Sequence, residues 1–323
     1  MPSRKPPVSI VVPVYNAEST IAECVEALLK LDYPKRLVQT IVVDNNSTDN
    51  TADILQQFTG IDYVFEPEKG AYQARNTGTE FAKHDLIAFT DADCIPKPDW
   101  LSRLVNGLVH PQRPTANSDF VGAAAKQTRH PPAKGLAIVG GKVEAHPPSN
   151  LVERYIDYRK ILDQEKMAKH SEFSLPFFVT ANFLVPKDVF EQLGGFDTYF
   201  EIAGDADFCW RAQQAGFELR YCPEAVVVHK HRSDLLGLYS QSFQYGFGRA
   251  SLFAKHGAGF HRRFRFDWKE HVFLVESILK SIIAPLARRS KFEALLPVFD
   301  TIAYSALTLG KIYGSFKRGT LVL

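Results

Sequence analysis

The sequence predicts an α/β protein with a mostly parallel central sheet flanked by helices, followed by a helical, basic and amphipathic C-terminal extension. Short, almost continuous apolar runs alternate with helical patterns, which is typical of a parallel sheet. The charge is uneven, because residues 230–323 carry 15 Lys and Arg against 6 Asp and Glu. With 323 residues, 45% of them apolar and 23% charged, the chain is long enough for one large domain and an appendage, and a disordered or collagen-like protein is excluded.

The first part of the chain consists of repeated strand and helix patterns. Residues 8–14 are an apolar run that ends at Tyr15-Asn16, and a helical pattern starts at Ile21. Residues 40–44 repeat the apolar run and are followed by the polar cluster 45–50. Further elements are predicted as a helix through residues 54–58, a strand over 62–66, a helix over 73–83 and a strand over 86–90.

The second part begins with residues 111–135, which are rich in Pro, Ala and polar groups and are predicted to form an exposed excursion. Regular elements then resume. The predictions are a strand over 137–144, a charged helix over 151–169, a strand over 177–185, and helices over 187–193 and 205–215 that end at Gly194-Gly195 and Gly216.

The predicted sheet gathers three polar segments at one edge. Tyr15-Asn16, residues 44–49 and Asp91-Ala-Asp93 each follow an apolar strand. The C-terminal ends of parallel strands share an edge, where open α/β sheets bind ligands. None of the segments has the Gly-x-Gly-x-x-Gly dinucleotide fingerprint or the Gly-x-x-x-x-Gly-Lys phosphate loop, which disfavours a Rossmann dehydrogenase and a P-loop enzyme.

The C-terminal extension combines apolar helices with basic residues. In residues 272–287 the apolar positions form one helical stripe, which predicts an amphipathic helix and not a membrane span. Residues 294–310 are more apolar, but Pro297 and Asp300 interrupt a stretch shorter than the roughly 20 residues of a span. An interfacial position on an anionic membrane and a helical pair packed on the body both fit the pattern. The nearby basic residues are Arg262, Arg263, Arg265, Arg288, Arg289, Lys317 and Arg318.

The cysteines and the N-terminus indicate the compartment. The four cysteines lie far apart with no Cys-x-x-Cys pair, which argues against a structural zinc site or a disulfide framework and favours a reducing compartment. The first seven residues carry charge but no apolar run, unlike a secretory signal. We expect a cytoplasmic protein that associates peripherally with the inner face of the cell membrane. Nucleic acid is disfavoured as a partner, because the basic residues interleave with apolar helices and no reading motif is present.

Asp91-Ala-Asp93 carries the clearest chemical signal. Two short carboxylates just past a strand point roughly the same way and can present oxygen to a hard divalent cation such as Mg²⁺ or Mn²⁺. Alone, the pattern is also typical of aspartates that form hydrogen bonds in strand-end turns. The surrounding segments decide between these interpretations.

Seven segments follow one another in order over about residues 8–231. They are Val8-Ser-Ile-Val-Val-Pro-Val-Tyr-Asn16, Ile41-Val-Val-Asp-Asn-Asn-Ser-Thr-Asp49, Gly70-Ala-Tyr-Gln-Ala-Arg-Asn76, Asp91-Ala-Asp93, Gly194-Gly-Phe-Asp197, Gly204-Asp-Ala-Asp-Phe-Cys-Trp-Arg211 and Tyr221-Cys-Pro-Glu-Ala-Val-Val-Val-His229. This ordered set resembles that of family 2 glycosyltransferases with the A-type nucleotide-sugar-binding fold. We therefore expect a catalytic domain over residues 1–231, with a nucleotide-binding half at about 8–100 and an acceptor half at about 136–231, and an extension over 232–323.

The resemblance implies a donor site at the predicted sheet edge. Asp44 would accept from the base, and Arg75 would approach the base or the diphosphate. The structural alternatives are a loop or helix cap for Asp44 and a solvated helix face for Arg75. The residues implied to bind the nucleotide sugar are Pro13, Tyr15, Asn16, Glu18, Asp44, Gly70, Arg75, Asp91 and Ala92.

The resemblance also implies a divalent cation and a general base. Asp93 would be the direct metal ligand and His229 would close the metal and diphosphate site, with His231 as the alternative. Asp205 is the candidate base for an acceptor hydroxyl. Residues i and i+2 do not share a helix face, so we expect either Asp205 or Asp207 to cap the helix that follows.

The implied reaction is a metal-dependent, inverting sugar transfer from a nucleoside diphosphate sugar, expected to be UDP-linked, to an acceptor hydroxyl. The acceptor would be a lipid-linked saccharide or another cell-envelope glycan. The segment Gln244–Arg249 differs from the Gln-x-x-Arg-Trp of processive synthases, which favours one transfer per encounter. Gly204 stands where the family has Glu, which favours a rival, non-catalytic carbohydrate- or lipid-binding protein. A sugar-phosphate nucleotidyltransferase is a second rival, but it should carry a Gly-rich basic loop where this chain has Tyr15-Asn-Ala-Glu-Ser19.

Overall fold

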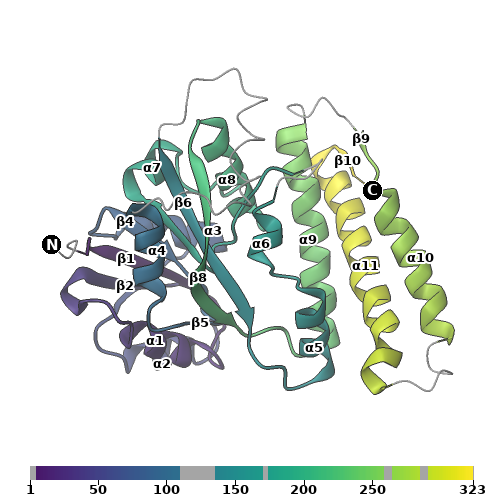
Figure 1. Cartoon of the computed structure of the whole chain (residues 1–323), viewed down its shortest axis with the longest axis horizontal. Helices are drawn as coiled ribbons and strands as arrows, with labels where there is room; N and C mark the ends of the chain where they lie inside the picture. The colour runs from purple at the N-terminus through teal and green to yellow at the C-terminus, as the bar shows by residue number, and fades with distance from the viewer. Residues whose placement is uncertain (1–4, 110–134, 170–173, 258–263, 284–289, 323) are drawn as a thin grey trace. The chain divides into compact units, whose positions relative to one another are not determined.

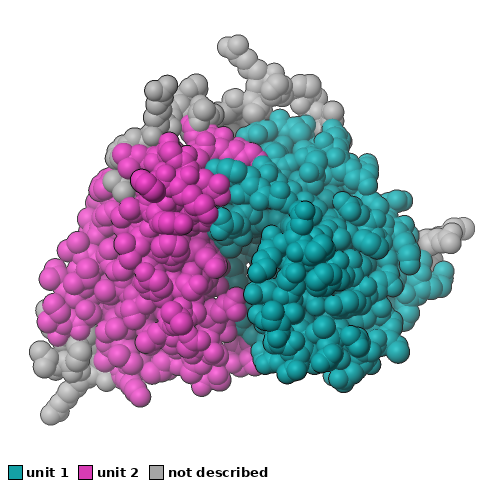
Figure 2. All heavy atoms as spheres, turned by 180° about the vertical axis from the view of Figure 1, so that it is seen from behind, with its two compact units in different colours: residues 1–144, 162–230 teal, residues 145–161, 231–323 magenta. Residues whose placement is uncertain are grey.

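The computed structural model describes residues 5–109, 135–169, 174–257, 264–283 and 290–322. The chain divides into two compact units, coloured separately in Figure 2. Unit 1 comprises residues 1–144 and 162–230, and unit 2 comprises residues 145–161 and 231–323. The boundary at residue 231, the division into nucleotide and acceptor halves and the excursion at 111–135 stay predictions, the last because residues 110–134 lie outside the described part.

Unit 1 is built on an eight-stranded sheet of order β3-β2-β1-β4-β7-β6-β8-β5 (Figure 1). The strands β1, β2, β3 and β4 pair in parallel, whereas β7 is antiparallel to β4 and β6, and β8 is antiparallel to β5. The predicted α/β class with a mostly parallel sheet is thereby confirmed. The strands are β1 (Val8–Val14), β2 (Val38–Asp44), β3 (Asp62–Phe65), β4 (Leu86–Phe89), β5 (Cys94–Pro96), β6 (Leu136–Ala145), β7 (Phe183–Pro186) and β8 (Glu218–His229).

Helices cover both faces of this sheet, which is why its strands are apolar at consecutive positions. Every residue of β1 is buried. Ile10 and Val12 join a core cluster with residues of α1 and α4, whereas Val11 faces α3, where a Cβ on Gly78 would lie 2.4 Å from it. The helices of unit 1 are α1 (Ile21–Leu29), the 3₁₀ helix η1 (Lys35–Leu37), α2 (Thr51–Gln56), α3 (Ala71–Glu80), α4 (Trp100–Val109), α6 (Gln164–Met167), α7 (Lys187–Gln192) and α8 (Gly204–Gln214).

The single charged helix predicted over residues 151–169 is wrong, because the structure has two helices there. The first, α5 (Leu151–Arg159), ends where Lys160 adopts a left-handed conformation with φ +50°. Asp163 then caps α6, since its carboxylate accepts from the backbone N–H of Lys166 at 3.2 Å.

The strand predicted over residues 177–185 starts only at Phe183. Just before it, the backbone N–H of Asn182 bonds to the Val179 carbonyl at 3.2 Å and closes a turn. The short strand β5 was not predicted at all. It pairs with β8, a strand more than a hundred residues later, so local sequence gives no signal for it.

Unit 2 is mainly helical, as predicted for the C-terminal extension, but it also includes residues 145–161, which were predicted to belong to the catalytic domain. Its helices α9 and α11 approach closely at two glycines. A Cβ on Gly246 would lie 2.0 Å from the carbonyl oxygen of Leu307, and one on Gly310 would lie 2.0 Å from that of Phe243. The elements of unit 2 are α5, α9 (Leu235–His256), α10 (Trp268–Ile283), α11 (Lys291–Arg318) and a two-stranded pair of β9 (Phe264–Arg265) and β10 (Leu321–Val322).

A cluster of charged side chains, of which only Lys311 is buried, links the three long helices of unit 2. Glu270 on α10 accepts hydrogen bonds from Lys311 on α11 and Arg249 on α9. Burial alone would raise the pKa of Glu270, but the charges of Arg249 and Lys311 lower it to about 2. Because the Lys311 side chain is buried, the ion pair with Glu270 is what keeps its charge compensated.

Pro297 and Asp300 do not interrupt the apolar stretch, contrary to prediction. Both lie inside α11, which runs for 28 residues from a capping box formed by Ser290. Asp300 can be buried within the helix because hydrogen bonds to the protein replace those to water. Its carboxylate accepts from Arg159 Nε at 2.8 Å and from the Tyr155 hydroxyl at 2.9 Å. Among the helices of the described residues, α11 alone has the length and the apolar composition that would allow a helix to cross a membrane.

The substitution Gly310→Ala should destabilise unit 2, because the added methyl group would overlap the Phe243 carbonyl oxygen and push α9 from α11. Overpacking typically costs about 1–3 kcal/mol, and contact with backbone puts the expected loss near about 3 kcal/mol. Chemical denaturation of the full chain followed by circular dichroism measures it. Leu309→Ala, at the neighbouring exposed position, is the matched control and should cost under about 1 kcal/mol. Equal stability of the two variants would contradict the close helix approach.

Candidate active site

The parallel strands bring three loops to one edge of unit 1. Val14 and Asp44, the last residues of β1 and β2, pair with each other, and the parallel strand β4 ends at Phe89, opposite Val11, three residues before the end of β1. At or just after these strand ends lie Tyr15-Asn16, residues 44–49 and Asp91-Ala-Asp93, the polar clusters predicted to meet. The sheet topology therefore places all three segments at this edge.

The loops after β1 and β2 are joined by the predicted residues themselves. Asn16, which has φ +48°, accepts the backbone N–H of Thr48 on its side-chain oxygen at 2.7 Å. Glu18 accepts the backbone and side-chain N–H groups of Asn50 at 3.0 and 2.8 Å. Pro13 is buried in β1, whereas the Tyr15 side chain is exposed. These contacts give both loops one fixed arrangement.

Asp44 and Gly70 shape the next part of the edge. The buried Asp44 carboxylate accepts from the Tyr63 hydroxyl and from the backbone N–H of Ser47, each at 2.9 Å. Burial and this hydrogen bond to Asp44 raise the pKa of Tyr63 to about 12. Gly70 has φ +146°, which only glycine adopts readily, and its N–H bonds to the Asn45 side chain at 2.7 Å. The start of α3 is thereby fixed against the loop that follows β2.

Arg75 on α3 points to Asp91 and is not on a solvated face. It is 6% exposed, and its Nη2 lies 2.5 Å from Asp91 Oδ1, while Nη1 donates to the Ala71 carbonyl at 3.2 Å. Among the described residues, the buried Nε of Arg75 has no acceptor. An unpaired buried donor costs about 1–3 kcal/mol, so this N–H is suited to an acceptor that arrives with a ligand.

Asp205 lies in the first turn of α8 and is 9% exposed. Its carboxylate accepts from the Tyr72 hydroxyl at 3.2 Å and from the backbone N–H of Ala206 at 2.9 Å. Burial raises the pKa of Asp205, and the hydrogen bond from Ala206, the charge of Arg75 and the hydrogen bond from Tyr72 oppose that rise. A carboxyl group with a raised pKa is suited to accept a proton.

Neither aspartate of the Asp205–Asp207 pair caps the helix, contrary to expectation. The N-cap is Ala203, in a left-handed conformation with φ +70°, and its side chain makes no cap hydrogen bond. Within the first turn, Asp205 accepts only from the N–H of the next residue, Ala206. Asp207 is fully buried and forms an ion pair with Arg211 one turn later at 2.8 Å. Asp207 is thereby committed to the interior of unit 1, which leaves Asp205 as the carboxylate of the pair that Tyr72 contacts.

Tyr72 is a site residue that sequence reasoning missed. Its ring packs on Phe196 at 5.4 Å between centroids, and the Arg75 guanidinium lies 5.4 Å from the ring centre. A Cβ on Gly204 would meet ring atoms of Tyr72 at 2.7–2.9 Å. Tyr72 thus connects Asp205 to the Arg75–Asp91 pair, and it requires glycine at position 204. The available signal was its spacing from Arg75, three residues along the same helix.

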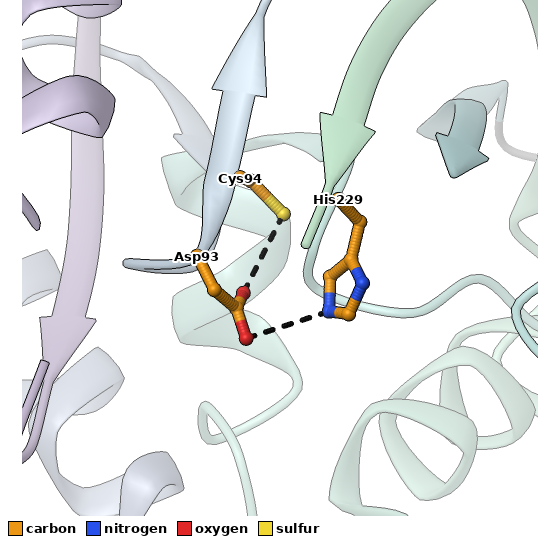
Figure 3. A group of neighbouring side chains, drawn as sticks. All are labelled: Asp93, Cys94 and His229. Atoms are coloured by element: carbon orange, nitrogen blue, oxygen red, sulfur yellow. Dashed lines mark hydrogen bonds and ion pairs between the residues drawn. The ribbon is translucent and has the colours of Figure 1, made fainter. Parts of the chain in front are cut away.

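The predicted metal ligands meet beside Asp91. Asp93 Oδ2 lies 3.5 Å from His229 Nε2, and Cys94 Sγ lies 3.8 Å from Asp93 Oδ1 (Figure 3). The cause is the pairing of β5 with β8, which continues as the Lys230 N–H bonds to the Asp93 carbonyl at 3.0 Å. Oxygen and imidazole nitrogen are donors that fit a divalent cation. The structure therefore brings His229 to Asp93, while the alternative His231 falls in unit 2.

The comparisons with known proteins agree with this geometry. The family model described as Glycosyl transferase family 2 matches residues 9–194. Glycosyltransferase AglE of Haloferax volcanii is 31% identical over 239 residues, which cover 72% of this chain and 69% of that protein. Pre-mycofactocin glycosyltransferase of Mycobacterium tuberculosis is 29% identical over 256 residues, 77% of this chain and 48% of that protein.

A solved structure shares the fold. It is that of the mannosyltransferase PcManGT from Pyrobaculum calidifontis in complex with GDP-Man and Mn²⁺. The TM-score is 0.62 at 20% sequence identity, and the match covers 98% of this chain and 89% of that one.

Proposed function

The chain belongs to glycosyl transferase family 2 and is a glycosyltransferase that uses a nucleotide sugar, and from this premise we propose an inverting, cation-dependent transfer of one sugar per encounter. The donor is a UDP-linked sugar and the acceptor a hydroxyl group, on a lipid-linked saccharide or another cell-envelope glycan. One observation carries the proposal: the buried Arg75 has an unpaired Nε at the sheet edge that also holds Asp91, Asp93 and His229.

In this proposal the nucleotide lies along the loops that follow β1 and β2. Asp44, buried at the end of β2, reads the base, and the joined loops of Asn16 and Glu18 border the nucleoside. Arg75 donates its unpaired Nε to the diphosphate, since guanidinium groups suit phosphate oxygens. The other residues proposed to border the donor are Pro13, Tyr15, Gly70, Asp91 and Ala92.

Asp93 and His229 are the residues that would hold the cation, and their oxygen and nitrogen donors lie 3.5 Å apart. Mn²⁺ and Mg²⁺ both accept carboxylate ligands, and imidazole is an acceptable further ligand. Once bound, such a cation supplies positive charge that stabilises the departing diphosphate. The complex of PcManGT contains Mn²⁺ together with GDP-Man, which supports a cation-dependent reaction here.

Asp205 is proposed as the general base. The acceptor oxygen forms a bond to the anomeric carbon while the bond from that carbon to the diphosphate oxygen breaks. The hydroxyl proton passes to the Asp205 carboxylate, and the nucleoside diphosphate leaves. Attack from the side opposite the leaving group inverts the anomeric centre without a covalent sugar intermediate.

We predict that release of nucleoside diphosphate from a panel of UDP- and GDP-linked sugars, with Mn²⁺ or Mg²⁺ present, falls about 100-fold or more in Asp93→Ala and Asp205→Ala. The assay measures the concentration of released nucleoside diphosphate. Asp188→Ala is the matched control, because Asp188 is an exposed carboxylate on α7 at the opposite end of β7, and it should keep the parental rate. Parental turnover in both site variants would refute the assignment, and donor binding without release would favour the non-catalytic rival.

The pH dependence tests the base. Asp205 must be deprotonated to accept a proton, so kcat/KM should rise as pH increases through its raised pKa. Tyr72→Phe removes a hydrogen bond that lowers this pKa, so the rising limb of the pH profile should move to higher pH. Above that limb, kcat/KM of the variant and of the parent should converge. Tyr33→Phe is the control, since Tyr33 is also buried and donates to the Pro6 carbonyl. An unmoved limb in Tyr72→Phe, or an equal shift in both variants, would overturn the proposed role of Asp205.

We further propose that unit 2 binds an anionic membrane peripherally through α10. Ser277 on this helix is only 3% exposed, whereas Glu276 and Lys280 are exposed and form an ion pair with each other. The predicted apolar stripe is on the outside, with Val275 57% and Leu279 56% exposed. An exposed apolar stripe on a basic extension is typical of helices that lie in a membrane interface. The remaining exposed apolar residues of α10 are Trp268, Val272, Ile278 and Ile282.

Flotation with liposomes containing anionic lipid at low salt tests the membrane proposal. The parent should float, and the double variant Val275→Ser, Leu279→Ser should partition about thirtyfold less, because each exposed side chain contributes about 1 kcal/mol of burial. Phe81→Ser, which removes an exposed apolar side chain from unit 1, should float like the parent. A parent that stays soluble, or equal flotation of all three proteins, would contradict the proposal. A changed oligomeric state in the double variant would instead identify α10 as a contact between copies.

A further inference from the structure

Cys94 lies in the cluster of side chains that includes the proposed cation ligands. It is the first residue of β5 and pairs directly with His229, the last residue of β8. Residues directly opposite each other in an antiparallel pair project their side chains to the same face of the sheet. Figure 3 shows the thiol and the imidazole both facing the Asp93 carboxylate. The strand register, and not local sequence, therefore brings sulfur beside nitrogen and oxygen.

The donor atoms of the three residues are close enough for one ion. Cys94 Sγ, Asp93 Oδ and the His229 ring nitrogen all lie within 4.8 Å of one another, with 3.8 Å and 3.5 Å for the two contacts of the carboxylate. Ligands of a tetrahedral Zn²⁺, at about 2.0–2.3 Å from the metal, lie roughly 3.3–3.7 Å apart. The two contacts of the Asp93 carboxylate, at 3.5 and 3.8 Å, are close to this spacing.

We propose that Cys94 is a third cation ligand and that the site consequently prefers a thiophilic d-block cation, such as Zn²⁺ or Co²⁺, to Mg²⁺. The inference rests on the cation site of the proposed function. Thiolate and imidazole are ligands that favour Zn²⁺ and its neighbours, whereas Mg²⁺ takes oxygen ligands almost exclusively. Three protein ligands leave a fourth position for water or a donor oxygen. On binding, the sulfur–metal bond replaces the S–H bond and one proton is released to solvent.

The side chains around Cys94 differ from those around the other three cysteines. Cys24 is also buried, and its Sγ contacts the carbonyl of Asp91 at 3.5 Å. Cys209 contacts the backbone of Phe178, and Cys222 lies by Glu224. Among the described residues, only Cys94 belongs to a group of three donor side chains within ligand reach of one another.

Titration of the full chain with Co²⁺, followed by electronic absorption in buffer without added thiol, tests the proposal. The parent should develop a sulfur-to-Co²⁺ charge-transfer band that saturates at one ion per chain. Cys94→Ser should lose the band, and the matched control Cys222→Ser should keep it. Competition between Zn²⁺ and Mg²⁺, followed by calorimetry, gives the ratio of the two affinities. Cys94→Ser should lower this ratio of Zn²⁺ to Mg²⁺ affinity by about tenfold or more.

The outcomes distinguish this inference from the proposed function. If the parent binds Co²⁺ but shows no charge-transfer band, and Asp93→Ala no longer binds Co²⁺, the role of Cys94 is overturned and the cation site stays in place. Co²⁺ binding that is the same in the parent, Asp93→Ala and His229→Ala would overturn the site itself. Loss of the band in Cys222→Ser would place the sulfur ligand elsewhere. If Cys94→Ser does not fold, the spectrum of the parent and of His229→Ala still decides, because the band must weaken when a ligand of the same ion is removed.

Discussion

The ion pair between Arg75 and Asp91 is the constraint on which the candidate site depends. Arg75 is buried on α3, a helix held against β1 and β2 by Gly78, so its charge has to be compensated within unit 1. Asp91 provides that compensation and is thereby committed to Arg75. The two aspartates of Asp91-Ala-Asp93 consequently have different partners, since Asp93 turns toward His229 and Cys94. The buried guanidinium of Arg75 thus gives the two aspartates different roles. Asp91 orients Arg75, and Asp93 faces the proposed site of the metal ion.

Unit 2 combines a charged cluster between its helices with an exposed apolar stripe. The buried Lys311 pairs with Glu270, which also accepts from the partly exposed Arg249, and glycines let α9 and α11 approach to backbone contact. The outer stripe of α10 is apolar. The pairing with Glu270 compensates the buried charge of Lys311, and the stripe on α10 leaves an apolar surface on unit 2.

How much could be read from sequence depends on the range of the contacts involved. The strands β1 and β2 were predicted within two residues, because their apolar runs are local, and the shared edge follows from parallel pairing. The break at Lys160 was missed, since a left-handed lysine has no reliable sequence signal. The continuity of α11 was missed because Asp300 is satisfied by Arg159, 141 residues away in the chain. The place of Tyr72 beside Asp205 depends in the same way on a contact over 133 residues.

The contact between Tyr72 and Gly204 gives a physical meaning to the one departure from the family pattern. A glutamate at position 204 cannot coexist with the ring of Tyr72, because even a Cβ would lie within 3 Å of it. The exchange replaces a neighbouring carboxylate, which would raise the pKa of Asp205 by repulsion, with a phenol that donates to it and lowers that pKa. Burial already raises the pKa of Asp205, and a second negative charge beside it would raise that pKa further. Glycine at 204 is therefore better explained as the partner of Tyr72 than as the loss of a catalytic group.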